Sequence, residues 1–166
     1  MPNRFADRLL RFVALLMLAW WVMTLSHEVG HLIGGWLGGA KLVRVELRPW
    51  HLPYSLFQPD PHPLLTLWAG PLFGVAFPVT MALIVKARWL WFVASFCSVA
   101  NGSYLATAWI SGDAHLDTSR LLQAGAWPAG IAVYCCLTIG WGYLRFRRAC
   151  IELLRGDEHH ACHNDI

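Results

Sequence analysis

The apolar run over residues 9–39 constrains this chain most, because it is long enough to cross a bilayer with some tilt. After Arg11, five polar residues interrupt it: Thr24, Ser26, His27, Glu28 and His31. Ionisable groups at membrane depth are costly, and by default they face a cavity or a partner. The run therefore predicts a membrane helix that carries a functional site.

The composition also favours a membrane protein. Of the 166 residues, 57% are hydrophobic and 14% are charged, whereas soluble domains have about 45–50% apolar and about 25% charged residues. Three more apolar runs follow, at 64–85, 89–110 and about 126–144. We expect an all-α integral membrane protein with about four transmembrane helices. Its single transmembrane domain would cover 1–150, and a polar C-terminal tail would cover 151–166.

The basic residues predict a topology. They lie before the first run, between the second and third, and after the fourth: Arg4, Arg8, Arg11, Lys86, Arg88, Arg145, Arg147 and Arg148. The positive-inside rule makes these segments cytoplasmic, together with both termini. A bacterial-type inner membrane is the expected location, and the net charge of +3 does not indicate a nucleic-acid surface. A cleaved signal peptide over 1–26 is the alternative, but the apolar run continues past the cleavage site.

Two other segments have recognisable patterns. Residues 41–47 alternate apolar and polar side chains, which predicts a short β-like segment after the first helix, with an edge that an extended peptide could pair with. The polar tail contains potential metal ligands, but its composition is typical of a disordered tail, and we expect no catalytic role for them. These residues are His159, His160, Cys162 and His163.

The motif HEVGH spans His27 to His31. Histidines four residues apart project from one face of a helix and can bind one metal ion, most naturally zinc. Glu28 is then available as an acid or base that takes a proton from a zinc-bound water. The alternative is that these polar groups only form hydrogen bonds between helices, but their spacing favours a metal.

A catalytic zinc site needs a third protein ligand, with the fourth position left for water. The expected topology restricts the candidates to the segment after the third span, where Asp113 and Asp117 lie. Each aspartate also has a purely structural explanation. Asp113 could be a helix N-cap, and Asp117 could be an acidic residue in the first turn of a helix, where the helix dipole favours negative charge. We expect one of the two to be a ligand, and His115 is a weaker candidate.

Together these features resemble the site-2 protease family of intramembrane zinc metalloproteases. The resemblance rests on HEVGH in the first run, AGPLFG at 69–74, and an aspartate after the third run. It implies zinc bound by His27 and His31, with Glu28 as the catalytic residue. For the third ligand, Asp117 stands in LDTSRLL, which is similar to the family's LDGGRLL, and Asp113 stands in GDA, similar to a GDG variant. We slightly prefer Asp113, because a loop-to-helix junction suits a ligand that turns toward the first helix.

The resemblance also implies a reaction and partners. The expected function is hydrolysis of peptide bonds in transmembrane or membrane-proximal segments of other membrane proteins, within the lipid bilayer. Asn101 stands where the family often has an Asn-x-x-Pro element, although the proline is missing, and it could orient a ligand or join two helices. Two alternatives remain, a non-catalytic metal-binding membrane protein that scaffolds or regulates a partner, and a metal-ion transporter. The transporter is disfavoured because the second and fourth runs have few polar residues.

Overall fold

The computed structural model describes residues 4–48, 50 and 53–155. The chain is mostly helical, as expected, with one small antiparallel sheet. In chain order, the elements of the described residues are α1 (Arg4–Leu37), β1 (Leu42–Glu46), β2 (Tyr54–Phe57), α2 (Pro63–Val85), α3 (Arg88–Ser111), α4 (Asp117–Gln123) and α5 (Pro128–Arg155). The tail residues His159, His160, Cys162 and His163 lie outside the described residues.

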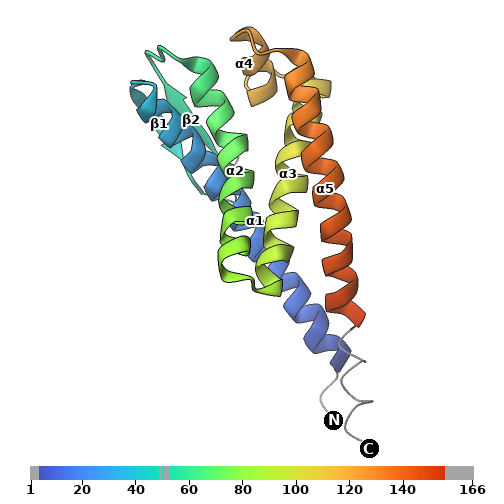
Figure 1. The fold of residues 1–166 in the computed structure, drawn as a ribbon. Helices are drawn as coiled ribbons and strands as arrows, with labels where there is room; N and C mark the ends of the chain where they lie inside the picture. The colour runs from blue at the N-terminus through green and yellow to red at the C-terminus, as the bar shows by residue number, and fades with distance from the viewer. Residues whose placement is uncertain (1–3, 49, 51–52, 156–166) are drawn as a thin grey trace, which may run out of the picture.

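The long helices α1, α2, α3 and α5 form an elongated bundle (Figure 1). The beginning of α1, the turn between α2 and α3, and the end of α5 all point toward one end of the bundle. The hairpin and the short helix α4 lie at the opposite end. All three basic groups expected to share one side of a membrane therefore lie toward the same end.

Within the described residues, three helices are long and apolar enough to cross a membrane: Phe5–Leu37, Pro63–Val85 and Pro128–Leu154. The expected count of four is not confirmed, because α3 is not among these three helices. Its polar residues Ser95, Ser98 and Asn101 are completely buried inside the bundle. A helix that other helices cover needs less apolar surface than one that faces lipid.

The hairpin confirms the expected β-like segment and adds a second strand. β1 pairs with β2, and Val45 lies opposite Ser55. The hairpin returns along α1: Phe57 packs against Gly35, the Ser55 hydroxyl donates to Glu28, and the Trp50 ring lies 6.1 Å from that of Trp21. These contacts place β2 next to the HEVGH motif.

Candidate metal centre

The two histidines of HEVGH face the interior of the bundle from α1. Both are buried, and their Nε2 atoms are 3.0 Å apart. One helical turn separates them, so the two rings meet edge to face with centroids 4.8 Å apart. Their Nε2 atoms thus converge on one point, as the motif predicted.

Asp117 completes a triangle with these nitrogens. Its Oδ2 lies 2.9 Å from His27 Nε2 and 3.2 Å from His31 Nε2. In a tetrahedral zinc site with bonds of about 2.0–2.1 Å, neighbouring ligand atoms are about 3.3 Å apart. All three sides of the triangle are slightly shorter than this separation, so a small outward shift of the side chains would fit an ion.

The hydrogen bonds on the far side of each imidazole fix its tautomer. His27 Nδ1–H donates to Asn101 Oδ1 at 2.7 Å, and the Asn101 amide nitrogen in turn donates to the Cys97 carbonyl. His31 Nδ1–H donates to the Thr66 backbone carbonyl at 2.8 Å, which can only accept. In both neutral rings, therefore, the lone pair of Nε2 points into the triangle.

With both rings neutral, three acceptors would meet in this buried space: two imidazole lone pairs and a carboxylate oxygen. Burial alone would raise the pKa of the Asp117 carboxyl, but the positive charge of a protonated His31 and hydrogen bonds from His27 and His31 outweigh burial and hold this pKa well below its usual range. Acceptors at such distances repel one another unless a positive charge lies between them. A proton on one ring or a metal ion supplies that charge.

Glu28 lies beside the histidines but outside the triangle. Its Oε2 accepts a 2.7 Å hydrogen bond from the Ser55 hydroxyl of β2, and both residues are buried. One ligand atom from each of His27, Glu28 and His31 lies within 4.8 Å of the others. These three residues could hold a metal ion by themselves, but the single bond from Ser55 leaves the Glu28 carboxylate able to accept another proton.

The structure brings Asp117 to the histidines and leaves Asp113 away from them, contrary to our slight preference for Asp113. α3 ends at Ser111 with Gly112 in the left-handed conformation, φ 66°, and Asp113 and His115 in the following turn are exposed. Asp113 Oδ1 accepts from the His115 backbone N–H. The helix begins four residues later than we assumed, so Asp117 occupies the loop-to-helix junction.

Several neighbours of the site had no signal in the sequence. Thr66 contributes a backbone carbonyl, which no side-chain pattern reveals, and Ser55 lies on the strand that was not predicted. The Tyr104 ring lies 5.5 Å from the His27 ring and perpendicular to it. Asn101 was noted as a possible ligand-orienting residue, and its bond to His27 matches that interpretation.

Fold and site together define a helical protein with membrane-length helices and a buried His–Glu–His group that could hold a metal ion. Neither a scan against protein-family models nor searches among curated proteins and solved structures gave a match.

Proposed function

We propose that this protein is a membrane-embedded zinc endopeptidase, similar to site-2 proteases, that hydrolyses peptide bonds in transmembrane or membrane-proximal segments of other proteins. One observation carries the proposal: the buried triangle of His27 Nε2, His31 Nε2 and Asp117 Oδ2, with the Glu28 carboxylate, held by Ser55, beside it. Asp117 Oδ2 lies within hydrogen-bond distance of both histidine Nε2 atoms, so the three atoms surround one point that either a proton or a metal ion can occupy.

The donor set suits zinc. Two imidazole nitrogens and one carboxylate oxygen form a common catalytic zinc set and leave a fourth position for water or substrate. When bound, zinc would polarise the substrate carbonyl and lower the pKa of a water molecule. The outer partners Asn101 and Thr66 orient the two rings, as outer partners do in metal sites in general.

Glu28 is the group that takes the proton of the attacking water. Ser55 holds one carboxylate oxygen of Glu28, so the position of this carboxylate is fixed by the hairpin as well as by α1. Glu28 then passes the proton to the leaving amine, as a general acid does after acting as a base. Ser55 is a positioning residue in this scheme.

The hairpin offers a place for the substrate backbone. β1 is exposed along most of its length, and within the described residues β2 is its only strand partner. A helical peptide bond is shielded from attack, whereas an unwound segment can add to a free strand edge through backbone hydrogen bonds. β2 links this edge to the Glu28 carboxylate through Ser55.

The proposed membrane arrangement has four spans, with α3 as the covered fourth. The basic end of the bundle faces the cytoplasm, and the hairpin and α4 face the opposite side of an inner membrane. His27 lies ten residues before the end of α1, about 15 Å along the helix axis. The site would therefore lie inside the bilayer, near the non-cytoplasmic side.

The test measures bound zinc and cleavage of single-span substrates in detergent for the wild type and the variants Glu28→Gln, Asp117→Ala and Asp113→Ala. The wild type should bind about one zinc ion per chain. Glu28→Gln should keep the zinc and lose at least about 100-fold in cleavage rate, since general acid–base catalysis contributes about that much or more. Asp117→Ala should lose zinc and activity, whereas the matched exposed variant Asp113→Ala should keep both.

Two results would contradict the proposal. Zinc binding without any Glu28-dependent cleavage would favour a non-catalytic metal-binding membrane protein that scaffolds or regulates a partner. Absence of stoichiometric zinc in the wild type would mean that a proton, and not a metal ion, neutralises the triangle.

A further inference from the structure

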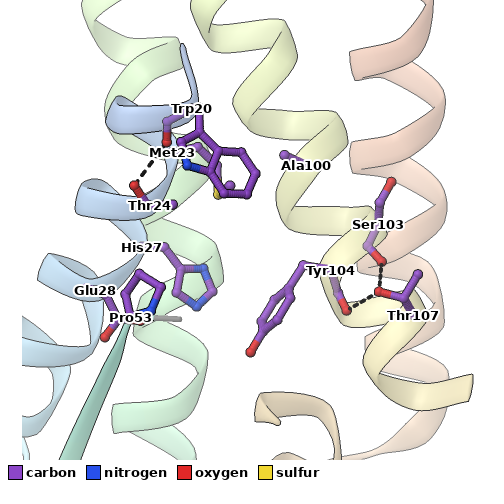
Figure 2. A pocket seen from close by; sticks show the side chains of 10 residues that line it. All are labelled: Trp20, Met23, Thr24, His27, Glu28, Pro53, Ala100, Ser103, Tyr104 and Thr107. Carbon is purple, nitrogen blue, oxygen red and sulfur yellow. Dashed lines mark hydrogen bonds between the residues drawn. The ribbon is translucent and has the colours of Figure 1, made fainter. Parts of the chain in front are cut away.

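A cavity of about 370 Å³ lies between α1 and α3 and reaches the candidate metal centre. Most of its wall consists of two facing stripes with helical spacing (Figure 2). The stripe on α1 is Trp20, Met23, Thr24 and His27, and the stripe on α3 is Ala100, Ser103, Tyr104 and Thr107. Glu28 and Pro53 close the cavity on the side of the hairpin.

The cavity exists because small residues stand opposite large ones. Ala100 and Ser103 on α3 leave the space in front of Trp20 and Met23 unfilled. An empty apolar space of this size destabilises the fold, because the side chains around it lose van der Waals contacts that larger residues would make. An apolar cavity of about 150 Å³ already holds a benzene ring, so this one has room for a leucine or phenylalanine side chain.

The lining is apolar in character despite its hydroxyl groups. The Thr24 hydroxyl donates to the Trp20 carbonyl at 3.0 Å, and the Thr107 hydroxyl donates to the Ser103 carbonyl at 2.8 Å. Both donors are therefore turned back onto their own helices. Apart from Glu28 and His27, the lining contains no ionisable group other than the Tyr104 phenol. A charged side chain would find no partner here away from the proposed catalytic groups.

The position of the cavity links the outside of the bundle to the site. Trp20 and Thr107 are exposed, so one side of the cavity lies at the seam between α1 and α3 on the outer surface. His27 and Glu28 are buried and lie at its inner side. A side chain that enters from the seam would bring its own backbone close to these two residues.

We infer that this cavity is the subsite that receives a bulky apolar side chain of the substrate, from a residue next to the cleaved bond, and that this side chain enters between α1 and α3. The inference rests on the proposed endopeptidase function and deepens it, because it names the side-chain class that the enzyme selects. Ala100 and Ser103 set the size limit, and Trp20 lines the end of the cavity opposite Glu28.

The test fills the cavity and measures side-chain preference. Once the cleavage site of a single-span substrate is mapped by mass spectrometry, each residue flanking that bond is changed to Ala, Leu or Phe. At one flanking position the wild type should prefer Leu or Phe over Ala by at least about 10-fold in kcat/KM, the usual scale of discrimination in hydrophobic pockets. Ala100→Phe should lower cleavage of the Leu and Phe substrates by about 10- to 100-fold and change the Ala substrate by less than about 3-fold.

Two further variants distinguish the effect of a filled cavity from that of misfolding. Ala132→Phe adds the same side chain on the exposed face of α5 and should leave the preference unchanged. Trp20→Ala widens the cavity and should shift the preference toward Phe, a gain that an unfolded protein cannot show. Bound zinc per chain is measured for every variant as a check on folding.

A second readout does not depend on turnover. A substrate with benzoylphenylalanine at the preferred position is irradiated with the Glu28→Gln variant, and the crosslinked residues are identified by mass spectrometry. Crosslinks to Met23, Ala100 or Thr107 would support the inference. Glu28-dependent cleavage with an unchanged preference in Ala100→Phe, or crosslinks only to other helices, would overturn it while leaving the proposed function intact. Absence of any Glu28-dependent cleavage would instead overturn the proposed function, and the inference with it.

Discussion

Asn101 orients the His27 ring at the candidate metal centre. Its amide nitrogen is held by the Cys97 carbonyl, so its oxygen must face His27 Nδ1. This arrangement fixes which imidazole nitrogen carries the proton and keeps Nε2 available to a metal ion. Asn101 is completely buried, so no water can replace its oxygen at that position.

Replacing Asn101 with leucine should therefore weaken zinc binding without unfolding the protein. The two side chains have a similar branched shape, but leucine cannot accept the Nδ1–H of His27. Loss of such an outer partner typically costs about 10- to 100-fold in metal affinity. A zinc titration against a competing chelator measures the effect. Ser98→Ala is the matched control on the same buried face of α3, because within the described residues its hydroxyl bonds only to the Ala94 carbonyl of its own helix. Equal zinc affinity in both variants would rule out the orienting role.

The sequence predicted His27, Glu28 and His31 because their spacing lies within one helix, where geometry follows directly from residue number. It did not separate Asp113 from Asp117, because that choice depends on where α4 begins. The Thr118 hydroxyl donates to the Leu105 carbonyl and ties the start of α4 to α3. Such a contact between distant turns determines the orientation of Asp117, and no local pattern reports it.

At the scale of elements, the bundle depends on the close approach of α1 and α2. A Cβ at Gly30 would lie 2.3 Å from the Ala69 carbonyl oxygen, and one at Gly34 would lie 2.4 Å from the Ala69 Cβ. Small-residue stripes allow such packing in membranes, where helices associate through contact and hydrogen bonds. The same approach brings Gly70 against His31, so the second helix also shapes the metal centre.

Gly70→Ala should displace His31 and reduce zinc binding. An added Cβ would lie 2.3 Å from His31 Nε2 and 2.4 Å from its Cε1, distances at which the ring must move. Alanine favours a helix over glycine by about 1 kcal/mol, so any loss would come from this contact and not from the backbone. Zinc per chain should fall well below that of the wild type. Gly140→Ala is the control, because a Cβ there meets nothing within 4 Å. Full zinc occupancy in Gly70→Ala would contradict the packing argument.

The apolar runs predicted the positions of α1, α2, α3 and α5, since each element must satisfy its own backbone hydrogen bonds in an apolar environment. Of the two strands in the hairpin, only β1 was predicted from the sequence. β1 has the alternation of an exposed strand, whereas β2 is four residues long and its partners are α1 and β1. A short strand that is stabilised by contacts with distant residues has little pattern of its own.

At the scale of the whole molecule, charge is distributed unevenly between the two ends of the bundle. Nine of the 13 Lys and Arg residues belong to the segments at the end that contains the α2–α3 turn, and four belong to the hairpin and α4 end. At the basic end, the Arg145 guanidinium lies 4.6 Å from the centre of the Trp91 ring and 5.7 Å from that of Trp141. Such amphipathic pairs suit the interface between lipid and water.

This asymmetry predicts that the α2–α3 turn is cytoplasmic and the turn between α3 and α4 is not. An epitope inserted after Lys86 should be cleaved by added protease only in inverted membrane vesicles. An epitope inserted after Ala114 should be cleaved only in spheroplasts. The two sites can be compared because both positions are exposed in the fold and lie at opposite ends of the bundle. Bound zinc in each tagged protein reports intact folding. The reverse pattern would place the metal centre near the cytoplasmic side, and substrates would then have to be cleaved from that side of the membrane.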